Sequence, residues 1–377
     1  MKSSLFAFLL LLQLFSCSDV ESGKADENAG SAAVTAKENP DYWYSVFSGR
    51  INNKEYVLYL SKGENYNGYF FDLENNIPVN VYSNIQDSLK DDSLILNGGN
   101  HYMSVQLNAV LRNGTIDGNL TFESPTAASR SFSFQLDEQK GYTPFEFYFV
   151  KGHASAPKKL NNESTADYRF GTVWPARDLP STLPLKQYIV SKIDSQTQMV
   201  SNPLALLEKA KSSAISSWQQ NMDTLTAATA GDLGLSLSQE NENTISVLHE
   251  DSAFLSIANF TYEYTGGAHG MHFTEVVNFN KQTGRQILLT DLLTKQGINA
   301  LPQLLEKAAR RAFEIKSGSL EQNGFFVNQI KPSNSYYFSN GGIGFYYAPY
   351  DLKSYAEGEI ILFIPSSDLQ PYLKKEK

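Results

Sequence analysis

Apolar and polar residues alternate in short runs through residues 40–150. The runs are 56–60, 68–71, 79–82, 94–96, 105–111 and 116–122. Because successive side chains of a strand point to opposite faces, such alternation indicates half-buried strands. Asn113 and Gly114 lie between two of the runs and favour a tight type I′ hairpin turn. Strands at this even spacing predict an antiparallel meander, a partly closed barrel or a sandwich.

The second half of the chain changes to a helical period. Residues 185–193 repeat at helical spacing, and Asn202 and Pro203 open a second helix. A third apolar stripe runs through residues 299–316. Trp218 lies in the stripe of the second helix, so we expect it in the core. Strands separate these helices without a regular βαβ order, which predicts an α+β fold with about three helices packed on a sheet.

A polar segment with several prolines separates the two patterns. Residues 151–181 include Pro157 and Pro175, and most of the others are polar. This composition is typical of a domain junction. We therefore predict a β-rich domain over residues 40–150 and an α+β module over residues 182–377.

The amino terminus has the pattern of a bacterial lipoprotein signal. Lys2 precedes an apolar run over residues 5–12, and Cys17 closes the segment. The run is too short to cross a bilayer, which needs ~20 residues, so we expect an export signal over residues 1–17. Cys17 is the only cysteine, which favours acylation over a disulfide. The small and acidic residues of 18–39 predict a flexible tether.

Two adjacent glycines interrupt an aromatic-rich stretch of the second half. The sequence YEYTGGAHGMHF occupies residues 262–273. Gly266 and Gly267 reach positive φ without steric penalty, so they suit a tight corner. The alternating aromatic residues on both sides predict two strands that meet at this shaped loop.

This loop and the segments after it resemble a DUF3298-type domain. The matching segments are GGAH at 266–269, a turn at 278–284, LTDLL at 289–293, a helix at 299–316 and a closing strand region at 348–373. The resemblance departs at Gly270, where proline is usual, and at His272, where an aromatic residue is expected. It implies an extracellular module like those of a lysozyme-sensing anti-sigma factor and of a peptidoglycan deacetylase. The sequence FSGRINNKEYVLYL from Phe47 is similar to a DUF4163-like region.

Length and charge narrow the class of protein. The chain has 377 residues, of which 41% are hydrophobic, enough for two or three cores. Its net charge of −9 disfavours a nucleic-acid binder, because phosphate binding needs a basic surface. An acidic surface would attract a cationic protein such as lysozyme. The same acidity also serves to keep an envelope protein soluble.

One set of residues could hold a metal ion. His269, His272 and Glu275 are the ligand types of a catalytic zinc site. On a strand, however, positions three apart face opposite sides, so only an irregular loop would bring them together. The alternative is that His269 closes the glycine loop by hydrogen bonding to nearby backbone. Motifs for a nucleophile elbow, a phosphate loop or a dinucleotide fold are absent, so we expect no enzyme activity and no cofactor.

These observations predict a lipid-anchored, non-catalytic binding protein of the cell envelope. We expect it at the outer membrane, on either the periplasmic or the cell-surface side. Its expected recognition surface is the loop of Gly266, Gly267, Ala268, His269 and His272 with the neighbouring aromatic strands. The expected partner is lysozyme, another cell-wall hydrolase or a glycan. Two alternatives stay open, a metal-dependent hydrolase or deacetylase of peptidoglycan and a structural subunit of an outer-membrane complex.

Overall fold

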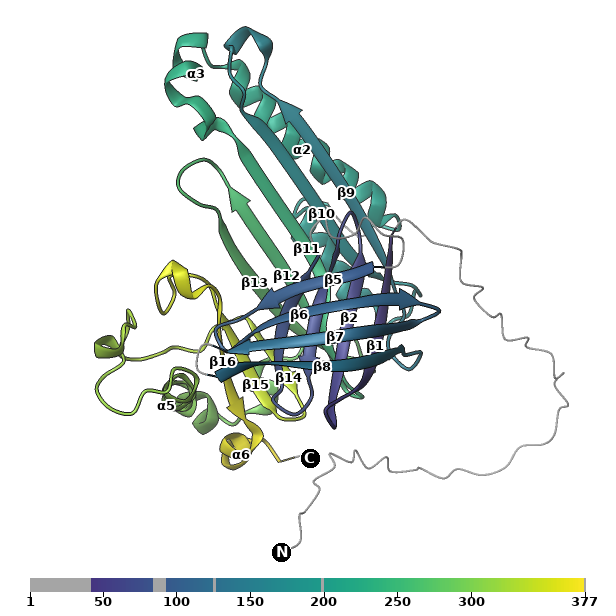
Figure 1. Cartoon of the computed structure of the whole chain (residues 1–377), viewed down its shortest axis with the longest axis vertical. Coiled ribbons are helices and arrows are strands. Elements are labelled where there is room, and N and C mark those ends of the chain that lie inside the picture. Colours follow the sequence, from purple (N-terminus) through teal and green to yellow (C-terminus); the bar gives the residue numbers. More distant parts are fainter. Residues whose placement is uncertain (1–41, 84–92, 125–126, 198–199, 376–377) are drawn as a thin grey trace, which may run out of the picture. The chain divides into compact units, whose positions relative to one another are not determined.

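The computed structural model of the chain describes residues 42–83, 93–124, 127–197 and 200–375 (Figure 1). By its internal contacts the chain divides into residues 1–40 and 41–377, and the second unit is described below. The predicted signal, Cys17 and the predicted tether lie outside the described residues. No helix in the described ranges combines the length and apolar character needed to cross a bilayer.

Eight antiparallel strands close into a barrel at the start of the second unit. They are β1 (Trp43–Ile51), β2 (Lys54–Lys62), β3 (Tyr66–Asp72), β4 (Ile77–Tyr82), β5 (Ser93–Gly99), β6 (Ser104–Arg112), β7 (Thr115–Ser124) and β8 (Ala127–Glu138). Pairing of β1 with β8, through Phe47 opposite Glu138, closes the ring. Alternate side chains such as Leu58, Phe70 and Leu107 fill its interior as a packed core.

The hairpin between β6 and β7 confirms the turn that the sequence predicts. Asn113 and Gly114 both have positive φ, 51° and 75°, as a type I′ turn requires. Arg112 pairs directly with Thr115, so the loop has two residues. All six predicted strands of this region are present, and the barrel is closed.

A five-stranded sheet follows the barrel. Its strands are β9 (Phe145–Ser155), β10 (Thr165–Pro175), β11 (Gln239–Glu250), β12 (Phe254–Tyr264) and β13 (Met271–Asn280), in the order β13-β12-β11-β10-β9. Only β10 and β11 pair in parallel, because helices connect them. These helices are α1 (Leu183–Ile193), α2 (Pro203–Asp223) and α3 (Ala227–Leu233).

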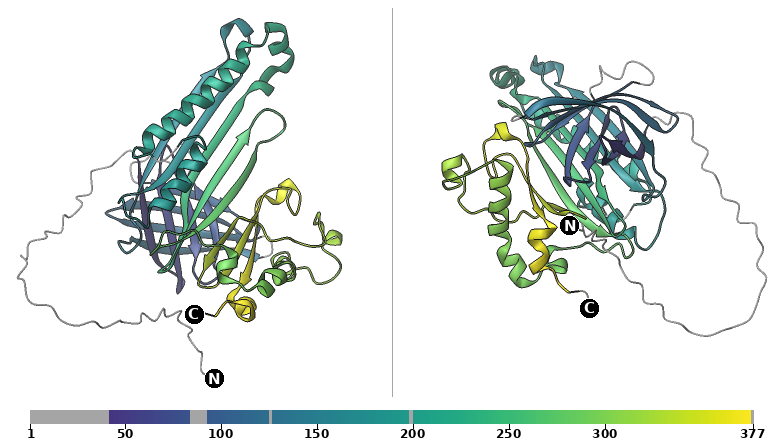
Figure 2. Two further views of the ribbon diagram at one scale, coloured as in Figure 1. Left: turned by 180° about the vertical axis from the view of Figure 1, so that it is seen from behind. Right: turned by 60° about the horizontal axis from the view of Figure 1, so that its bottom comes forward.

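Helix α2 packs along β9 and β10, as Figures 1 and 2 show. Asn202 caps its start by accepting a hydrogen bond from the amide of Ala205 at 3.1 Å. Trp218 is a core residue as predicted, with 2% of its surface exposed. Its indole N–H donates to the carbonyl of Leu237 at 3.0 Å, which satisfies the one polar group of the buried ring.

A three-stranded sheet and the helix α5 form the carboxyl-terminal part. The elements are α4 (Leu289–Leu292), α5 (Lys295–Ala312), β14 (Tyr336–Ser339), β15 (Gly342–Tyr347), β16 (Ile360–Pro365) and α6 (Ser366–Leu369). Leu301, Leu305 and Ala309 of α5 are buried against this sheet. The helix begins at Lys295, four residues before the predicted start, because Thr294 caps it by accepting from the amide of Gly297.

The predicted α+β class is confirmed, but the predicted junction is wrong. Residues 151–181 contain the end of β9 and all of β10, so most of this segment is sheet. The sheet begins at Phe145, and the barrel ends at Glu138. The prolines misled the prediction because they lie at element boundaries: Pro175 is the last residue of β10. The described part of the chain holds six α-helices, three of them the predicted ones.

The barrel and the five-stranded sheet share one hydrophobic core. Outward-facing side chains of β2 and β3 join buried residues of the sheet strands in a single cluster. Phe71 of β3 stacks on His249 of β11 with ring centroids 4.3 Å apart. Tyr59 of β2 donates its hydroxyl to the carbonyl of Glu250 and accepts from the amide of the same residue. These contacts hold one side of the barrel against the sheet, beside the cleft described next.

Candidate ligand-binding cleft

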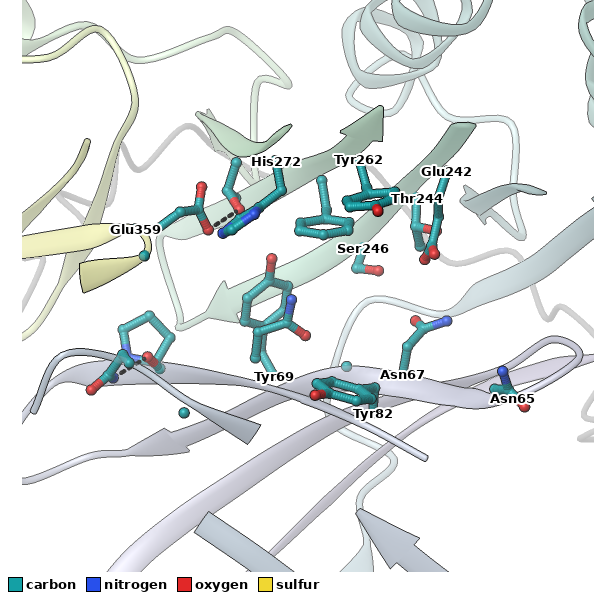
Figure 3. A pocket seen from close by; sticks show the side chains of 18 of the residues that line it. Asn65, Asn67, Tyr69, Tyr82, Glu242, Thr244, Ser246, Tyr262, His272 and Glu359 are labelled. Atoms are coloured by element: carbon teal, nitrogen blue, oxygen red, sulfur yellow. Dashed lines mark hydrogen bonds between the residues drawn. The ribbon is translucent and has the colours of Figure 1, made fainter. Parts of the chain in front are cut away.

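A cleft of about 860 Å³ lies between the barrel and the five-stranded sheet. Strands β3 and β4 supply one wall, and β11, β12 and β13 supply the other (Figure 3). Residues 356–359, just before β16, close one end. Clefts that bind small molecules have volumes of roughly 300–1,000 Å³ and combine apolar surface with a few placed polar groups.

The barrel wall carries amide and phenol side chains. Asn67 and Tyr69 are two residues apart on β3, so their side chains emerge on the same face. Asn65 precedes the strand, and Tyr82 ends β4 with 51% of its surface exposed. In Figure 3 the side chains of Asn67 and Tyr69 point from the barrel toward the sheet, and those of Asn65 and Tyr82 lie along the barrel wall. They present ring faces and amide groups to the cleft.

The sheet wall is built from two rows of cross-strand neighbours. One row contains Glu242, Tyr262 and His272, and the other contains Thr244, Phe260 and Thr274. Residues directly opposite on antiparallel strands have Cβ atoms about 4.5–5.5 Å apart, so each row forms a continuous surface. All six residues line the cleft.

Three buried oxygen atoms of the cleft walls have no hydrogen-bond partner within the described residues. They are Oδ1 of Asn65, Oδ1 of Asn67 and Oε1 of Glu359. A buried polar atom that lacks a partner destabilises a fold by roughly 1–3 kcal/mol, so most such atoms are paired. Three acceptors in one cavity favour a ligand that donates hydrogen bonds to them.

Glu359 has the most perturbed carboxyl group of the cleft. It directly precedes β16, and its Oε2 accepts a hydrogen bond from the hydroxyl of Thr274 at 2.8 Å. Burial disfavours the charged form and raises the pKa of the carboxyl to about 7. Within the described ranges no lysine or arginine forms an ion pair with Glu359.

The opposite end of the cleft is also acidic. Arg169 of β10 pairs with Glu240 at 2.5 Å and lies 3.8 Å from Glu64, which Lys151 also contacts at 2.6 Å. Glu242 lies beside Arg169 in the register, and burial raises the pKa of its carboxyl group. Arg169 is the only lysine or arginine among the described residues that line the cleft.

The predicted glycine loop joins β12 to β13. Gly266 and Gly267 have φ of 88° and 103°, which confirms the predicted need for glycine. A Cβ at Gly266 would run into the carbonyl oxygen of Ser236, whereas a Cβ at Gly267 would have no neighbour within 4 Å. Tyr264 donates its hydroxyl to the carbonyl of Gly267 at 3.1 Å and so holds the loop closed. Ala268 is exposed at its tip.

The two predicted histidines have different environments. His269 is exposed, its Nδ1 lies 3.0 Å from the carbonyl of Gly270, and its ring stacks on Tyr355 at 4.0 Å. The alternative reading, in which His269 closes the loop through backbone, agrees with this contact. His272 is half-buried and lines the cleft, where burial lowers the pKa of its imidazole.

Glu275 does not join the histidines. It lies on the face of β13 opposite to His272, and its carboxylate pairs with Lys192 of α1 at 2.6 Å. The alternative zinc site of His269, His272 and Glu275 is therefore not assembled. Within the described ranges no group of three or more histidine, cysteine, aspartate or glutamate residues is placed to hold a metal ion.

Most of the cleft residues were missed by the sequence analysis. Asn65, Asn67, Glu242 and Glu359 belong to no motif, and they come together only when the barrel packs on the sheet. The choice of His272 and the alternating aromatic residues around it were the signals that pointed to this wall.

Comparison with known proteins identifies one part of the chain. Residues 290–367 match the family described as "Protein of unknown function (DUF3298)". A DUF3298 domain is present there. It spans α5 and the strands β14 to β16 and contributes Glu359 to the cleft, whereas the glycine loop and His272 precede it. No curated protein matches the sequence.

Two solved structures of DUF3298 family proteins align with this chain. A crystal structure of a DUF3298 family member from Bacteroides fragilis NCTC 9343 aligns with a TM-score of 0.55 and 21% identity over 63% of this chain and 96% of that chain. A DUF3298 family protein from Pseudomonas aeruginosa PAO1 aligns with a TM-score of 0.44 and 18% identity over 61% and 95%. The first likeness shows that the fold is shared.

Proposed function

We propose that this protein is a lipid-anchored, non-catalytic binding protein of the cell envelope and that its cleft takes up a glycan. The observation that carries the proposal is a set of three buried oxygen atoms in one cavity, those of Asn65, Asn67 and Glu359, which have no partner among the described residues. Sugar hydroxyl groups are donors that can satisfy such acceptors. The resemblance to modules of a lysozyme-sensing anti-sigma factor and a peptidoglycan deacetylase supports an envelope role.

The aromatic side chains of the cleft favour a sugar over a purely ionic compound as the ligand. Tyr82 on the barrel wall and Phe260 and Tyr262 on the sheet wall line the same cavity. Rings of this kind offer an apolar face, and tyrosine adds a hydroxyl group at the edge. A pyranose has matching chemistry, because its C–H groups form apolar faces and its hydroxyl groups lie around the rim.

Calorimetric titration of the full chain with the tetramers of N-acetylglucosamine and of glucosamine tests the glycan proposal. We expect binding to at least one tetramer. Asn67→Leu, which removes one acceptor, should weaken that binding by roughly 3–10-fold, the value of one hydrogen bond. Asn97→Leu is the matched control, because Asn97 is half-buried in β5 of the same barrel but lies outside the cleft. Failure of both tetramers to bind would overturn the proposed function.

A second candidate function is protein binding at the tip of the β12–β13 hairpin. Met271 and Phe273 expose 39% and 43% of their surfaces there, next to the exposed residues 267–269. Exposed apolar side chains beside a tight loop suit a protein partner, and the acidic chain would attract a cationic one such as lysozyme.

Retention of lysozyme by the immobilised full chain tests this second candidate. Phe273→Ser should reduce the retained lysozyme, because it removes an exposed apolar contact without touching the core. Leu288→Ser, at a residue that is 48% exposed outside the hairpin, serves as the control. If the unmodified chain does not retain lysozyme, this second candidate is ruled out.

A further inference from the structure

The lining of the cleft has an excess of carboxyl groups. The glutamates that line it are Glu64, Glu240, Glu242, Glu357 and Glu359. Arg169 forms an ion pair with Glu240 and also lies near Glu64. Lys353 is the cation near Glu357, at 3.8 Å. Glu359 has no such neighbour among the described residues, and the cleft therefore contains a buried acid without a cation.

Glu359 is held in a fixed position, with one oxygen satisfied and the other open. Thr274 donates a hydrogen bond to Oε2, and Glu359 lies between Gly358, with φ of 66°, and the first residue of β16. Oε1 is buried and has no partner in the described part of the protein. Figure 3 shows the carboxyl group on the same side of the cleft as His272.

A metal ion does not fit this carboxyl group. A divalent cation needs several ligand groups, and the described residues contain no cluster of three. An ammonium group needs fewer, because it can donate to one carboxylate and to neighbouring neutral acceptors. The amide oxygens of Asn65 and Asn67 on the facing wall are acceptors for other donor groups of the same ligand. A ligand ammonium would also offset the loss of hydration that the buried carboxylate suffers.

We propose that Glu359 anchors an ammonium group of the ligand, so that the cleft prefers a glycan with free amino groups to its N-acetylated or neutral counterparts. This inference rests on the proposed glycan-binding function and adds the chemical class of the sugar. The hydroxyl groups of the same ligand contact Asn65 and Asn67, and its ring packs on the aromatic side chains of the sheet wall.

Four probes of similar length test the inference by calorimetry with the full chain at one pH. They are the tetramers of glucosamine, N-acetylglucosamine and glucose, and tetralysine. We expect the glucosamine tetramer to bind about tenfold more tightly than the acetylated and neutral tetramers, the advantage of one charge-assisted contact. This comparison uses the unmodified protein, so it does not depend on the folding of a variant.

Glu359→Gln should remove most of that preference, because the glutamine side chain keeps an acceptor oxygen but carries no charge. Glu357→Gln is the matched control, because it removes the same charge at an exposed residue of the cleft rim and should preserve the preference. Equal binding of the glucosamine and N-acetylglucosamine tetramers, with no effect of Glu359→Gln, overturns the inference and leaves the glycan function standing. Absence of binding by every sugar overturns both. If tetralysine binds more tightly than every sugar and Glu359→Gln loses that binding, the ligand that carries the ammonium group is not a sugar, and the inference is overturned.

Discussion

At the scale of single residues, Glu359 combines burial with an incomplete set of partners. The hydroxyl of Thr274 donates a hydrogen bond to the carboxyl group of Glu359, and no lysine or arginine of the described residues forms an ion pair with it. Burial raises its pKa from the ordinary 4.5 to about 7, so the folded protein keeps a proton that the unfolded chain has already lost. A purely structural acid would gain nothing from this arrangement, whereas a ligand-binding acid gains a partner on binding.

This raised pKa predicts a pH dependence of stability. Between pH 4.5 and about 7 the folded state binds more protons than the unfolded state, so the free energy of unfolding should fall as pH rises and then level off. Each unit of pKa difference corresponds to about 1.4 kcal/mol before solvent screening. Urea unfolding should therefore show that the stability of Glu359→Gln, measured relative to the unmodified protein, increases between pH 4 and pH 8. The exposed Glu357→Gln should show no such trend, and a flat difference for Glu359→Gln would contradict the account.

At the scale of elements, the alternation of apolar residues and the turn residues predicted most strands correctly, whereas the prolines led to a wrong domain junction. The runs over 56–60 and 116–122 became β2 and β7 because one face of each strand is buried in the barrel. The junction over 151–181 was wrong because Pro157 and Pro175 mark the ends of strands in one sheet, not a linker between domains. Proline signals where an element stops, and it carries no information about which sheet the element joins.

The β12–β13 hairpin supplies the prediction at this scale. Gly266→Ala and Gly267→Ala both place an alanine at positive φ, which destabilises by about 1–2 kcal/mol. Only Gly266→Ala adds a clash, because its Cβ would meet the carbonyl of Ser236. We expect Gly266→Ala to lower the free energy of unfolding by more than Gly267→Ala does. Equal losses in thermal or urea unfolding would show that contact with Ser236 does not constrain the loop.

At the scale of the whole molecule, the cleft exists because the barrel packs on the sheet along one side only. Tyr59 and Phe71 seal that side through His249 and Glu250. The polar residues of β3 and β11 face each other beyond it. Sequence analysis found the histidine and the aromatic residues of β12–β13, because they are close along the chain. It could not find Asn67 or Glu359, because only tertiary packing brings them together.

A crystal structure of the full chain soaked with the glucosamine tetramer tests the central claim most directly. We predict that the sugar lies in the cleft, with hydroxyl groups hydrogen-bonded to Asn65 or Asn67 and an amino group at Oε1 of Glu359. A sugar bound elsewhere on the protein, with the side chains of the cleft unchanged and in contact only with solvent, would contradict the account.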